Sequence, residues 1–277
     1  FSRDETAAKV TAYMDTDSRV ELIRHSTNQG VGAAIASGYK ASLEKEYDVT
    51  VVMAGDAQMD PADLPKIVGP VAEEGVDYAK GNRLVHGQAW NLIPRHRYIG
   101  NAVLSLFTKI VSGYWHVADS QCGYTAISLN ALNSIDIGLL YPRYGIPNDI
   151  LVKLNIADCT VRDVPIRPVY NIGEVSEIKM VPVIFTISRL LIRRFYERLV
   201  QKYVIRDFHP LVFFYVLGLI SFIPGAISGF YLFFFRLFVG PVSATSALFA
   251  AFLVTTGLQF LLFAMWFDME HNKHLKG

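Results

Sequence analysis

Two long stretches near the C-terminus contain no charged side chain. The first covers residues 211–235 and the second covers residues 237–267, and each exceeds the roughly 20 residues that a helix needs to cross a membrane. Arg236 and the pair Gly240-Pro241 mark a turn between them. The pattern predicts a hairpin of two transmembrane helices. The alternative is a pair of buried core helices, which rarely contain apolar runs this long and this rich in Phe and Leu.

Basic residues gather at the two outer ends of the predicted hairpin, whereas the connection between the spans is very short. Six precede the first span and two follow the second: Arg189, Arg193, Arg194, Arg198, Lys202 and Arg206, then Lys273 and Lys276. Positive residues near membrane spans are retained on the cytoplasmic side. Both ends of the hairpin are therefore expected to face the cytoplasm.

Residues 179–209 repeat with a period of four. One ridge is basic and another is apolar: Arg194, Arg198, Lys202 and Arg206 on the first, and Ile187, Leu191, Phe195, Leu199 and Tyr203 on the second. This spacing predicts an amphipathic helix. Because the segment runs directly into the first span, we expect it to lie in the membrane interface with its basic ridge on anionic head groups. The alternative is a charged face packed on the protein's own core.

The N-terminal part alternates between helical and strand-like patterns. Residues 4–13, 32–43 and 61–74 are predicted as helices, whereas residues 20–24 and 49–53 are predicted as strands. This alternation is typical of an α/β domain with a parallel sheet. In such sheets ligands bind at the carboxyl ends of the strands.

The overall composition agrees with a chain that is part soluble and part membrane-embedded. Of the 277 residues, 52% are hydrophobic and 18% are charged, and the mean hydropathy is +0.29. The formal net charge of +1 gives no support for a nucleic-acid partner. Cys122 and Cys159 are expected to be free thiols in a reducing cytoplasm.

The predicted strand at residues 49–53 is followed by a cluster of oxygen-bearing side chains. Asp56, Gln58 and Asp60 stand in the sequence DAQMDP. Asp60 directly precedes Pro61, which is the pattern of a helix N-cap, and we assign it that structural role. Asp56 and Gln58 remain, and their oxygens are ligands of the kind that Mg²⁺ or Mn²⁺ prefers beside substrate phosphates.

The order of motifs resembles family 2 glycosyltransferases of the GT-A fold. The motifs are NQGVG at residues 28–32, DAQMDP at residues 56–61, KGNR at residues 80–83 and DSQCGY at residues 119–124. The likeness is strongest to the polyprenyl-phosphate glycosyltransferases, typified by dolichol-phosphate mannose synthase. Some members also carry an interfacial helix and C-terminal transmembrane helices, so the resemblance spans nearly the whole chain.

The resemblance also shows two departures from the family pattern. Residues 1–6 look like the tail of the family's Asp-Asp-x-Ser-x-Asp-x-Thr element, which implies that the chain is truncated and that a first strand and an acidic pair lie upstream. The family's metal motif is usually Asp-x-Asp-x-Gln, and here Ala54 stands at the first Asp. In the resembling group the metal contacts come chiefly from the second Asp and the Gln, here Asp56 and Gln58.

The resemblance implies roles for individual residues. Asp56 and Gln58 would bind the metal. The donor would be bound by Gln58 together with Asn28, Gly30, Asp119 and Lys179, with Gln121 and Ser176 beside them. The acceptor phosphate would be bound by Arg83, Arg97 and Asn101, and Arg97 is ranked above Arg95 by its spacing to Asn101.

Asp149 aligns with an acidic residue that acts as a base in other members of the broader family. It is counted with Asp56 as catalytic, although here it is expected to orient donor or acceptor groups. A helix N-cap is an equally good interpretation of Asp149.

The implied activity is an inverting transfer of sugar from a nucleotide sugar to a polyprenyl phosphate, either dolichyl or undecaprenyl. The acceptor phosphate is already ionised, so no protein base is needed, and a divalent cation would offset the charge of the leaving diphosphate. The implied organisation is a GT-A domain (1–178), juxtamembrane helices (179–209), a transmembrane hairpin (210–268) and a tail (269–277), with the catalytic domain on the cytoplasmic side of a multi-pass membrane protein.

Two other classes of function remain open at this stage. A membrane-bound polysaccharide synthase would share the domain and the helices, but it should carry Gln-x-x-Arg-Trp on its interfacial segment, which residues 190–203 lack. A non-enzymatic module with a degenerate transferase fold is supported by Ala54 and by the missing N-terminal element.

Overall fold

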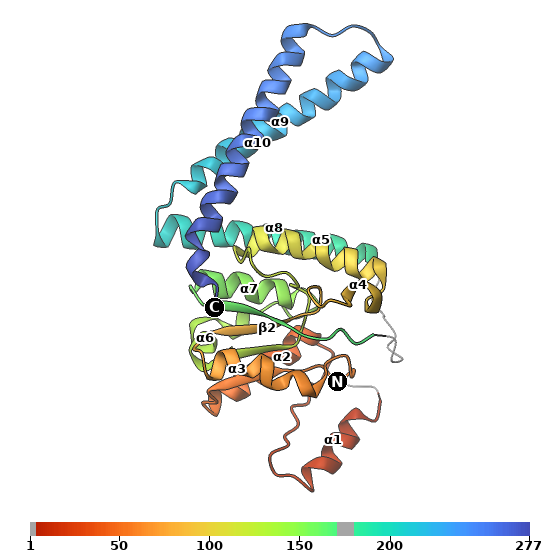
Figure 1. Cartoon of the computed structure of the whole chain (residues 1–277), viewed down its shortest axis with the longest axis vertical. Helices are drawn as coiled ribbons and strands as arrows, with labels where there is room; N and C mark the ends of the chain where they lie inside the picture. The colour runs from red at the N-terminus through yellow and green to blue at the C-terminus, as the bar shows by residue number, and fades with distance from the viewer. Residues whose placement is uncertain (1–3, 171–179) are drawn as a thin grey trace.

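The computed structural model describes residues 4–170 and 180–277. A layered α/β domain lies at one end, helices lie across its top, and a long helical hairpin projects away from it (Figure 1). The elements run, in chain order, α1 (Thr6–Met14), α2 (Val31–Glu44), β1 (Val49–Val52), η1 (Pro61–Asp63), α3 (Leu64–Ala72), β2 (Tyr78–Asn82), α4 (Ala89–Leu92), α5 (Arg95–Ser112), β3 (Thr125–Ser128), α6 (Leu129–Ser134), η2 (Ile137–Leu139), α7 (Ile146–Ile156), β4 (Val161–Pro165), α8 (Met180–Val200), η3 (Gln201–Arg206), α9 (Leu211–Phe238), α10 (Ala244–His271) and η4 (Lys273–Leu275).

The predicted α/β class is confirmed, but the predicted parallel sheet is wrong. The described sheet has the strand order β1-β3-β2-β4, in which β2 and β4 are parallel and β3 is antiparallel to both β1 and β2. The connection from β2 to β3 begins and ends at the same end of the strands, so β3 starts beside the last residues of β2 and runs in the opposite direction. The sheet is therefore mixed.

The predicted helices of the N-terminal part are present as α1, α2 and α3, the last one entered through the 3₁₀ turn η1. The predicted strand at residues 20–24 is wrong, because no strand of the described sheet pairs with that segment. Leu22 and Ile23 are exposed there. Without a neighbouring strand, the apolar residues of this segment have no sheet face to bury.

Side chains pack on both faces of the sheet. Consecutive residues of β3 point to opposite faces. Ile127 therefore joins the core beneath α2, α6 and α7, whereas Ala126 joins the core beneath α3. Helices therefore cover both faces of the sheet, and the candidate site lies at the ends of the strands.

The predicted juxtamembrane helix is present as α8, and it continues into η3, a turn of π-helix. Its expected orientation is wrong. The basic ridge faces the protein: Arg198 is fully buried, Lys202 is 2% exposed and the side chain of Arg194 is 12% exposed. The apolar ridge also packs inward, where Ile187 and Leu191 contact α5 and α7.

A different face of α8 is exposed and mostly apolar, with the exposed Arg189 among its residues. It carries Ile184, Phe185, Ile192 and Tyr196, and the exposed face of α5 carries Ile99, Val103, Leu106 and Phe107. The two helices lie side by side below the hairpin (Figure 1). We name these eight residues the apolar collar. It replaces the basic ridge as the surface of this segment that suits a membrane interface.

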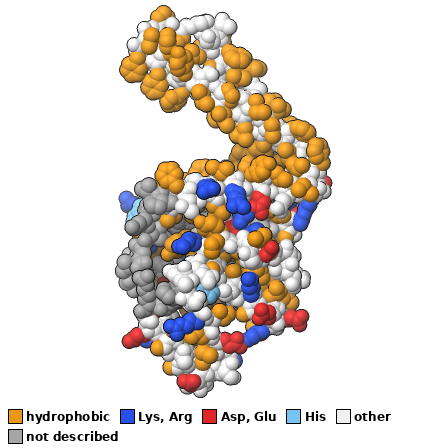
Figure 2. Space-filling view, turned by 180° about the vertical axis from the view of Figure 1, so that it is seen from behind, with side chains coloured by type: hydrophobic (Ala, Val, Ile, Leu, Met, Phe, Trp, Pro, Cys, Tyr) orange, Lys and Arg blue, Asp and Glu red, His pale blue; other side chains and the backbone are white. Residues whose placement is uncertain are grey.

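The two predicted spans form the antiparallel helices α9 and α10. Both are long and apolar enough to cross a membrane, and most of each is exposed, unlike the core helix of a soluble protein. Glycines bring them together: a Cβ on Gly257 would lie 2.4 Å from the backbone nitrogen of Phe222. On the face shown in Figure 2, hydrophobic side chains cover the hairpin and charged side chains lie on the domain.

The chain returns to the α/β domain after the hairpin. Leu275 is 1% exposed and belongs to the core beneath α2, α6 and α7, and the N–H of Gly277 donates to the carbonyl of Val161 at 3.1 Å. Lys276 pairs with Val161 as a parallel bridge. The predicted tail at residues 269–277 is therefore packed on the domain, and both ends of the hairpin lie on the domain's side.

Candidate active site

The loop after β1 contains the predicted metal ligands. Asp56 is exposed, and its Oδ1 accepts the N–H of Gln58 at 3.0 Å. Ala57 between them has a φ of 60°. Asp60 accepts the N–H of Ala62 at 2.9 Å, so its predicted capping role is confirmed. The turn keeps Asp56 and Gln58 on one short loop at the sheet edge.

These two residues fit a divalent cation that keeps water and phosphate oxygens as its remaining ligands. The amide nitrogen of Gln58 is buried and has no hydrogen-bond partner among the described residues, so bound substrate can satisfy it. Ala54 offers no ligand. Within residues 4–170 and 180–277, no group of three or more His, Cys, Asp or Glu side chains is arranged to hold a metal.

The loop at residues 28–32 is held by close packing. Gly30 has a φ of 97°, and its N–H donates to Oδ1 of Asn28 at 3.0 Å. A Cβ on Gly30 would lie 2.4 Å from the carbonyl oxygen of Pro142, and one on Gly32 would lie 2.1 Å from that of Tyr141. Glycine is required at both positions for this contact. The donor-binding roles of Asn28 and Gly30 remain predictions.

Arg83 and Asp119, predicted to contact different substrates, bind each other. Nε of Arg83 lies 2.8 Å from Oδ2 of Asp119, and Nη2 lies 3.1 Å from Oδ1. The backbone N–H of Arg83 also donates to Oδ2, at 3.1 Å. Asp119 is fully buried. Burial raises the pKa of this carboxyl, but the Arg83 guanidinium and its hydrogen bonds outweigh burial and hold the pKa below its ordinary value.

Tyr170 connects the two arginines predicted to bind the acceptor phosphate. Nη1 of Arg83 donates to its hydroxyl at 3.2 Å, and the guanidinium of Arg97 lies 5.7 Å from the centre of its ring. Arg95 instead lies over Trp90, at 5.5 Å. The shared tyrosine is a physical reason to rank Arg97 ahead of Arg95 as a candidate ligand of the acceptor phosphate. Asn101 follows Arg97 by one turn of α5 and is partly buried.

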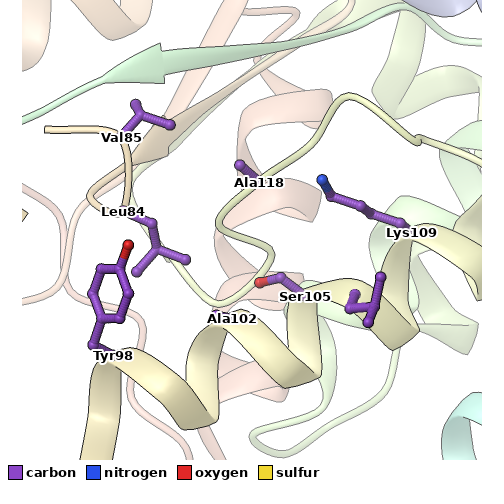
Figure 3. Close-up of a pocket in the computed structure, with 8 residues that line it drawn as sticks. Leu84, Val85, Tyr98, Ala102, Ser105, Lys109 and Ala118 are labelled. Carbon is purple, nitrogen blue, oxygen red and sulfur yellow. The ribbon is translucent and has the colours of Figure 1, made fainter. Parts of the chain in front are cut away.

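A hollow of about 340 Å³ opens between α5 and the loops that follow Arg83 and precede Asp119. Its lining is mostly apolar, with one ammonium group, and it includes Leu84, Val85, Tyr98, Ser105, Leu106 and Lys109. From α5, Tyr98 points toward Leu84 and Val85, and Lys109 reaches toward the loop that carries Ala118 (Figure 3). The sequence analysis missed this hollow, although the spacing of Tyr98, Ser105 and Lys109 along one helix is a signal of a shared face.

Asp149 lies in the first turn of α7 and is fully buried. It accepts the N–H of Tyr141 at 2.7 Å and forms an ion pair with Arg194 of α8. Burial raises the pKa of this carboxyl, and the Arg194 guanidinium acts against that shift. The cap position of α7 is Gly145, so the N-cap interpretation of Asp149 is wrong. Lys179 and Ser176 lie outside the described residues.

Beneath the strand ends, Asp163 holds two segments of the site. Its Oδ2 accepts Nδ2 of Asn82 at 2.6 Å and the N–H of Ala118 at 2.6 Å. Burial raises the pKa of Asp163 from 3.8 to about 6. Lys80, 1% exposed, donates to the carbonyl of Cys122, and burial lowers the pKa of its ammonium group.

Asp163 should give stability a specific pH dependence. Between its unfolded pKa near 3.8 and its folded pKa of about 6, the folded protein holds a proton that the unfolded chain has released. The contribution of Asp163 to the free energy of unfolding is therefore full below pH 3.8 and is lost as the pH rises toward 6. We expect Asp163→Asn, which cannot ionise, to gain about 3 kcal/mol relative to the parent protein between pH 4 and pH 7.

Denaturant unfolding of both proteins across this pH range measures that difference. Asp48→Asn is the control, because Asp48 is exposed and its side chain makes no hydrogen bond or ion pair with the other described residues. A difference between Asp163→Asn and the parent that stays constant with pH would show that Asp163 does not titrate in this range.

Residues 1–135 match the sequence profile of Glycosyl transferase family 2. A Methanocaldococcus jannaschii relative, named only as an uncharacterized protein, is 30% identical over 168 residues, which are 61% of this chain and 69% of that one. The chain belongs to glycosyl transferase family 2. The predicted family is confirmed.

This family 2 chain is also similar to an enzyme with a named activity. UDP-N-acetylglucosamine–dolichyl-phosphate N-acetylglucosaminyltransferase of Methanococcus voltae is 31% identical over 153 residues, 55% of this chain and 61% of that enzyme. The chain thus spans about three fifths of that relative. Among solved structures, glucosyl-3-phosphoglycerate synthase from Mycobacterium tuberculosis, determined with Mn²⁺ and UDP, aligns with a TM-score of 0.46 and 19% identity over 72% of this chain and 66% of its own.

Proposed function

We propose that this family 2 protein transfers a sugar from a nucleotide sugar to a polyprenyl phosphate at a membrane surface. The observation that carries the proposal is that Arg83 and Arg97 both contact Tyr170. Arg97 lies on α5, the helix that also forms part of the apolar collar. A phosphate held there would belong to a molecule whose tail lies in the membrane. The name of the Methanococcus voltae relative, which acts on dolichyl phosphate, supports the same acceptor class.

The donor is proposed to lie at the sheet edge, with Asn28, Gly30 and Gln58 around it and with its diphosphate beside Asp56. Mg²⁺ or Mn²⁺ bound by Asp56 and Gln58 would offset the negative charge that develops on the departing nucleoside diphosphate. Lys179 is proposed to approach the same phosphates. Asp149, buried under α8, is proposed to orient the segment at Tyr141 that packs on Gly30, because its carboxylate holds the N–H of Tyr141.

The acceptor needs no protein base. A phosphate monoester is ionised at neutral pH, so its oxygen attacks the anomeric carbon directly, and the bond from that carbon to the donor diphosphate breaks on the opposite side. This in-line geometry inverts the anomeric centre. Arg97 and Asn101 are proposed to hold the acceptor phosphate, and guanidinium groups suit that task because they bind phosphate oxygens in pairs.

The hollow beside α5 is proposed to take the first isoprene units of the acceptor. Its walls are mostly apolar, and Lys109 supplies a cation at its edge. Leu84 follows Arg83 directly in the chain, so the hollow adjoins the arginine side of the site. The phosphate of the acceptor would then lie near the arginines, and its isoprene chain would pack against apolar side chains.

The site is proposed to face the cytoplasm. Both ends of the hairpin lie on the side of the domain, and basic residues flank them. A tag after Gly277 should be digested by protease added to the cytoplasmic side of sealed vesicles, whereas a tag at Gly240 should be protected. The reverse pattern would refute this orientation.

The test of the activity uses the full chain in vesicles. A panel of radiolabelled sugar nucleotides is supplied with polyprenyl phosphate or with the corresponding polyprenol, and labelled lipid is extracted. Transfer to the phosphate but not to the alcohol is expected, because the alcohol lacks the charged group that the arginines recognise. Equal transfer to both would refute the acceptor class, and no transfer from any donor would favour the non-enzymatic module.

A further inference from the structure

The basic ridge, which runs from α8 into η3, binds the C-terminal ends of two helices of the α/β domain. Nε of Arg198 donates to the carbonyl of Val111 at 2.8 Å, and Nη2 donates to that of Ile110 at 3.0 Å. Both carbonyls belong to the last turn of α5. Nζ of Lys202 donates to the carbonyl of Asn155, in the last turn of α7, at 2.9 Å. Carbonyls at helix ends lack partners within the helix and carry partial negative charge, so cations stabilise them.

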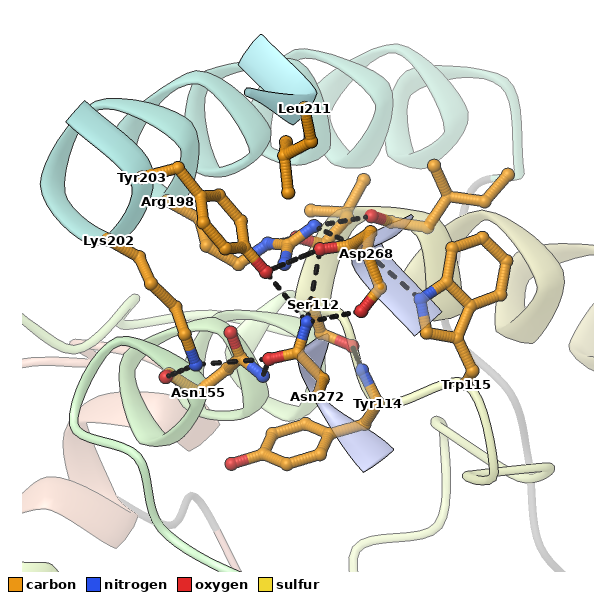
Figure 4. A network of polar contacts seen from close by, with 12 residues as sticks. Ser112, Tyr114, Trp115, Asn155, Arg198, Lys202, Tyr203, Leu211, Asp268 and Asn272 are labelled. Carbon is orange, nitrogen blue, oxygen red and sulfur yellow. Dashed lines mark hydrogen bonds and ion pairs between the residues drawn. The ribbon is translucent and has the colours of Figure 1, made fainter. Parts of the chain in front are cut away.

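Asp268, near the end of α10, completes the contact to α5. Its two oxygens accept Nη1 and Nη2 of Arg198 at 2.8 and 3.0 Å. Tyr203 and Trp115 donate to the same carboxylate at 2.5 and 3.0 Å. Figure 4 shows these side chains converging between α8, α10 and the domain. Arg198 and Asp268 are both fully buried.

The hydrogen bonding of this pair is complete. A guanidinium has five N–H donors. Those of Arg198 are directed at Val111, Ile110, both oxygens of Asp268 and the hydroxyl of Tyr203, the last at 3.2 Å. Gly113, which ends α5 with a φ of 78°, makes room: a Cβ there would lie 2.4 Å from Nη1 of Arg198. A buried ion pair with every donor satisfied specifies one geometry between its two elements.

This geometry bears on the acceptor site because α5 is a single helix. Its C-terminal turn is fixed to α10 through Arg198, and its N-terminal turns carry Arg97 and Asn101. Arg97 and Val111 are separated by about 21 Å along the helix at 1.5 Å per residue. A tilt of about 5° at the fixed end would move Arg97 by about 2 Å, and misplacement of this size is costly to a reaction that depends on alignment.

We infer that Asp268 and Arg198 are positioning residues for the acceptor. They set the angle of α5 against the membrane hairpin, so that Arg97 and Asn101 meet a phosphate at the depth where the membrane presents it. This inference rests on the proposed function for its consequence in catalysis. The structural part of the inference, that the Asp268 carboxylate fixes α5, does not depend on the proposed function and has its own test.

The catalytic consequence is measured with Asp268→Asn in the full chain in vesicles, using whichever sugar nucleotide the panel identifies. The KM for polyprenyl phosphate should rise by about tenfold or more, and the KM for the sugar nucleotide should stay within about twofold. Glu270→Gln is the matched control, because Glu270 lies on the same helix and its side chain is 66% exposed. An unchanged KM for polyprenyl phosphate, with or without a fall in kcat, would overturn the inference.

A second variant covers the case in which Asp268→Asn does not accumulate. Arg198→Met combined with Asp268→Leu replaces the pair by apolar side chains, a change that folded proteins often tolerate. The contacts to Ile110 and Val111 are then lost, so the same rise in the KM for polyprenyl phosphate is expected. An unchanged KM in a folded double variant would show that packing alone positions α5.

The distance between two spin labels tests the structural part of the inference. Spin labels on Ile99→Cys and Lys273→Cys report the separation of α5 from the base of α10, and Cys122 and Cys159 are too buried to react. A narrow distribution is expected in the parent protein and a broader one in Asp268→Asn. An unchanged distribution would refute the inference whether or not transfer occurs. A broadened distribution in a protein without transferase activity would refute the proposed function alone.

Discussion

Asp56→Ala is expected to lower sugar transfer by about a thousandfold while leaving the fold intact. A metal that offsets the charge of a leaving diphosphate contributes several kcal/mol to the transition state, and each 1.36 kcal/mol is a factor of ten in rate. Within the described residues the Asp56 carboxylate accepts the N–H of Gln58, and the side chain is exposed. Its removal should therefore cost little stability. Transfer rates and a melting curve on the same preparation measure both effects.

Asp60→Ala is the matched control, because it lies on the same loop and should show the opposite result. It removes the cap of η1, which typically costs 0.5–2 kcal/mol of stability, and it should leave transfer nearly unchanged. Ala54→Asp restores the family's first carboxylate and should leave transfer equal or higher. Full turnover of Asp56→Ala, or of the parent protein in excess EDTA, would exclude a metal at this loop.

The sequence predicted elements well where one segment contains its own signal. The two spans, the juxtamembrane helix and the helices at α2 and α3 each show a period or a run that is visible in their own residues. Strand direction has no such signal. Residues 125–128 are compatible with a strand in either direction. The antiparallel pairing of β3 depends on where the long connection over residues 83–124 returns to the sheet.

The basic ridge illustrates a second limit. A period of four shows that Arg194, Arg198 and Lys202 share one face of a helix, but it does not show what that face meets. Three of the acceptors of Arg198 and Lys202, the carbonyls of Val111, Ile110 and Asn155, are backbone atoms. Every sequence contains such atoms at every position. The carbonyls at the ends of α5 and α7 become partners of these side chains only in the folded protein, where both ends are buried beneath α8 and η3.

The candidate site shows a third limit. Family motifs placed Arg83, Arg97 and Asp119 near the substrates, and the structure brings Arg83 and Asp119 together and sets Arg97 over the same tyrosine. The pairing of Arg83 with Asp119 joins residues far apart in the sequence. Motif matching assigns each residue a role toward substrate, and it does not reveal that two of them first satisfy each other.

Arg83→Ala is therefore expected to act on stability as well as on transfer. The carboxylate of Asp119 is fully buried, and Arg83 provides three of its hydrogen bonds, of which the two from the side chain would be lost. Breaking a buried ion pair by removing one partner leaves an uncompensated charge and typically costs about 3–5 kcal/mol. We expect a loss of that size in the free energy of unfolding, measured by denaturant unfolding of detergent-solubilised protein.

Arg97→Ala separates the two effects of this change. Its guanidinium lies over Tyr170, a contact that contributes about 0.5–2 kcal/mol, so the variant should lose less stability than Arg83→Ala while transfer to polyprenyl phosphate falls steeply. Arg83→Leu combined with Asp119→Leu removes both buried charges and should recover most of the stability that Arg83→Ala loses. If that double variant is as unstable as Arg83→Ala, the cost does not arise from the unpaired Asp119 carboxylate. If it also regains transfer, then Arg83 serves the fold and Arg97 alone holds the acceptor phosphate.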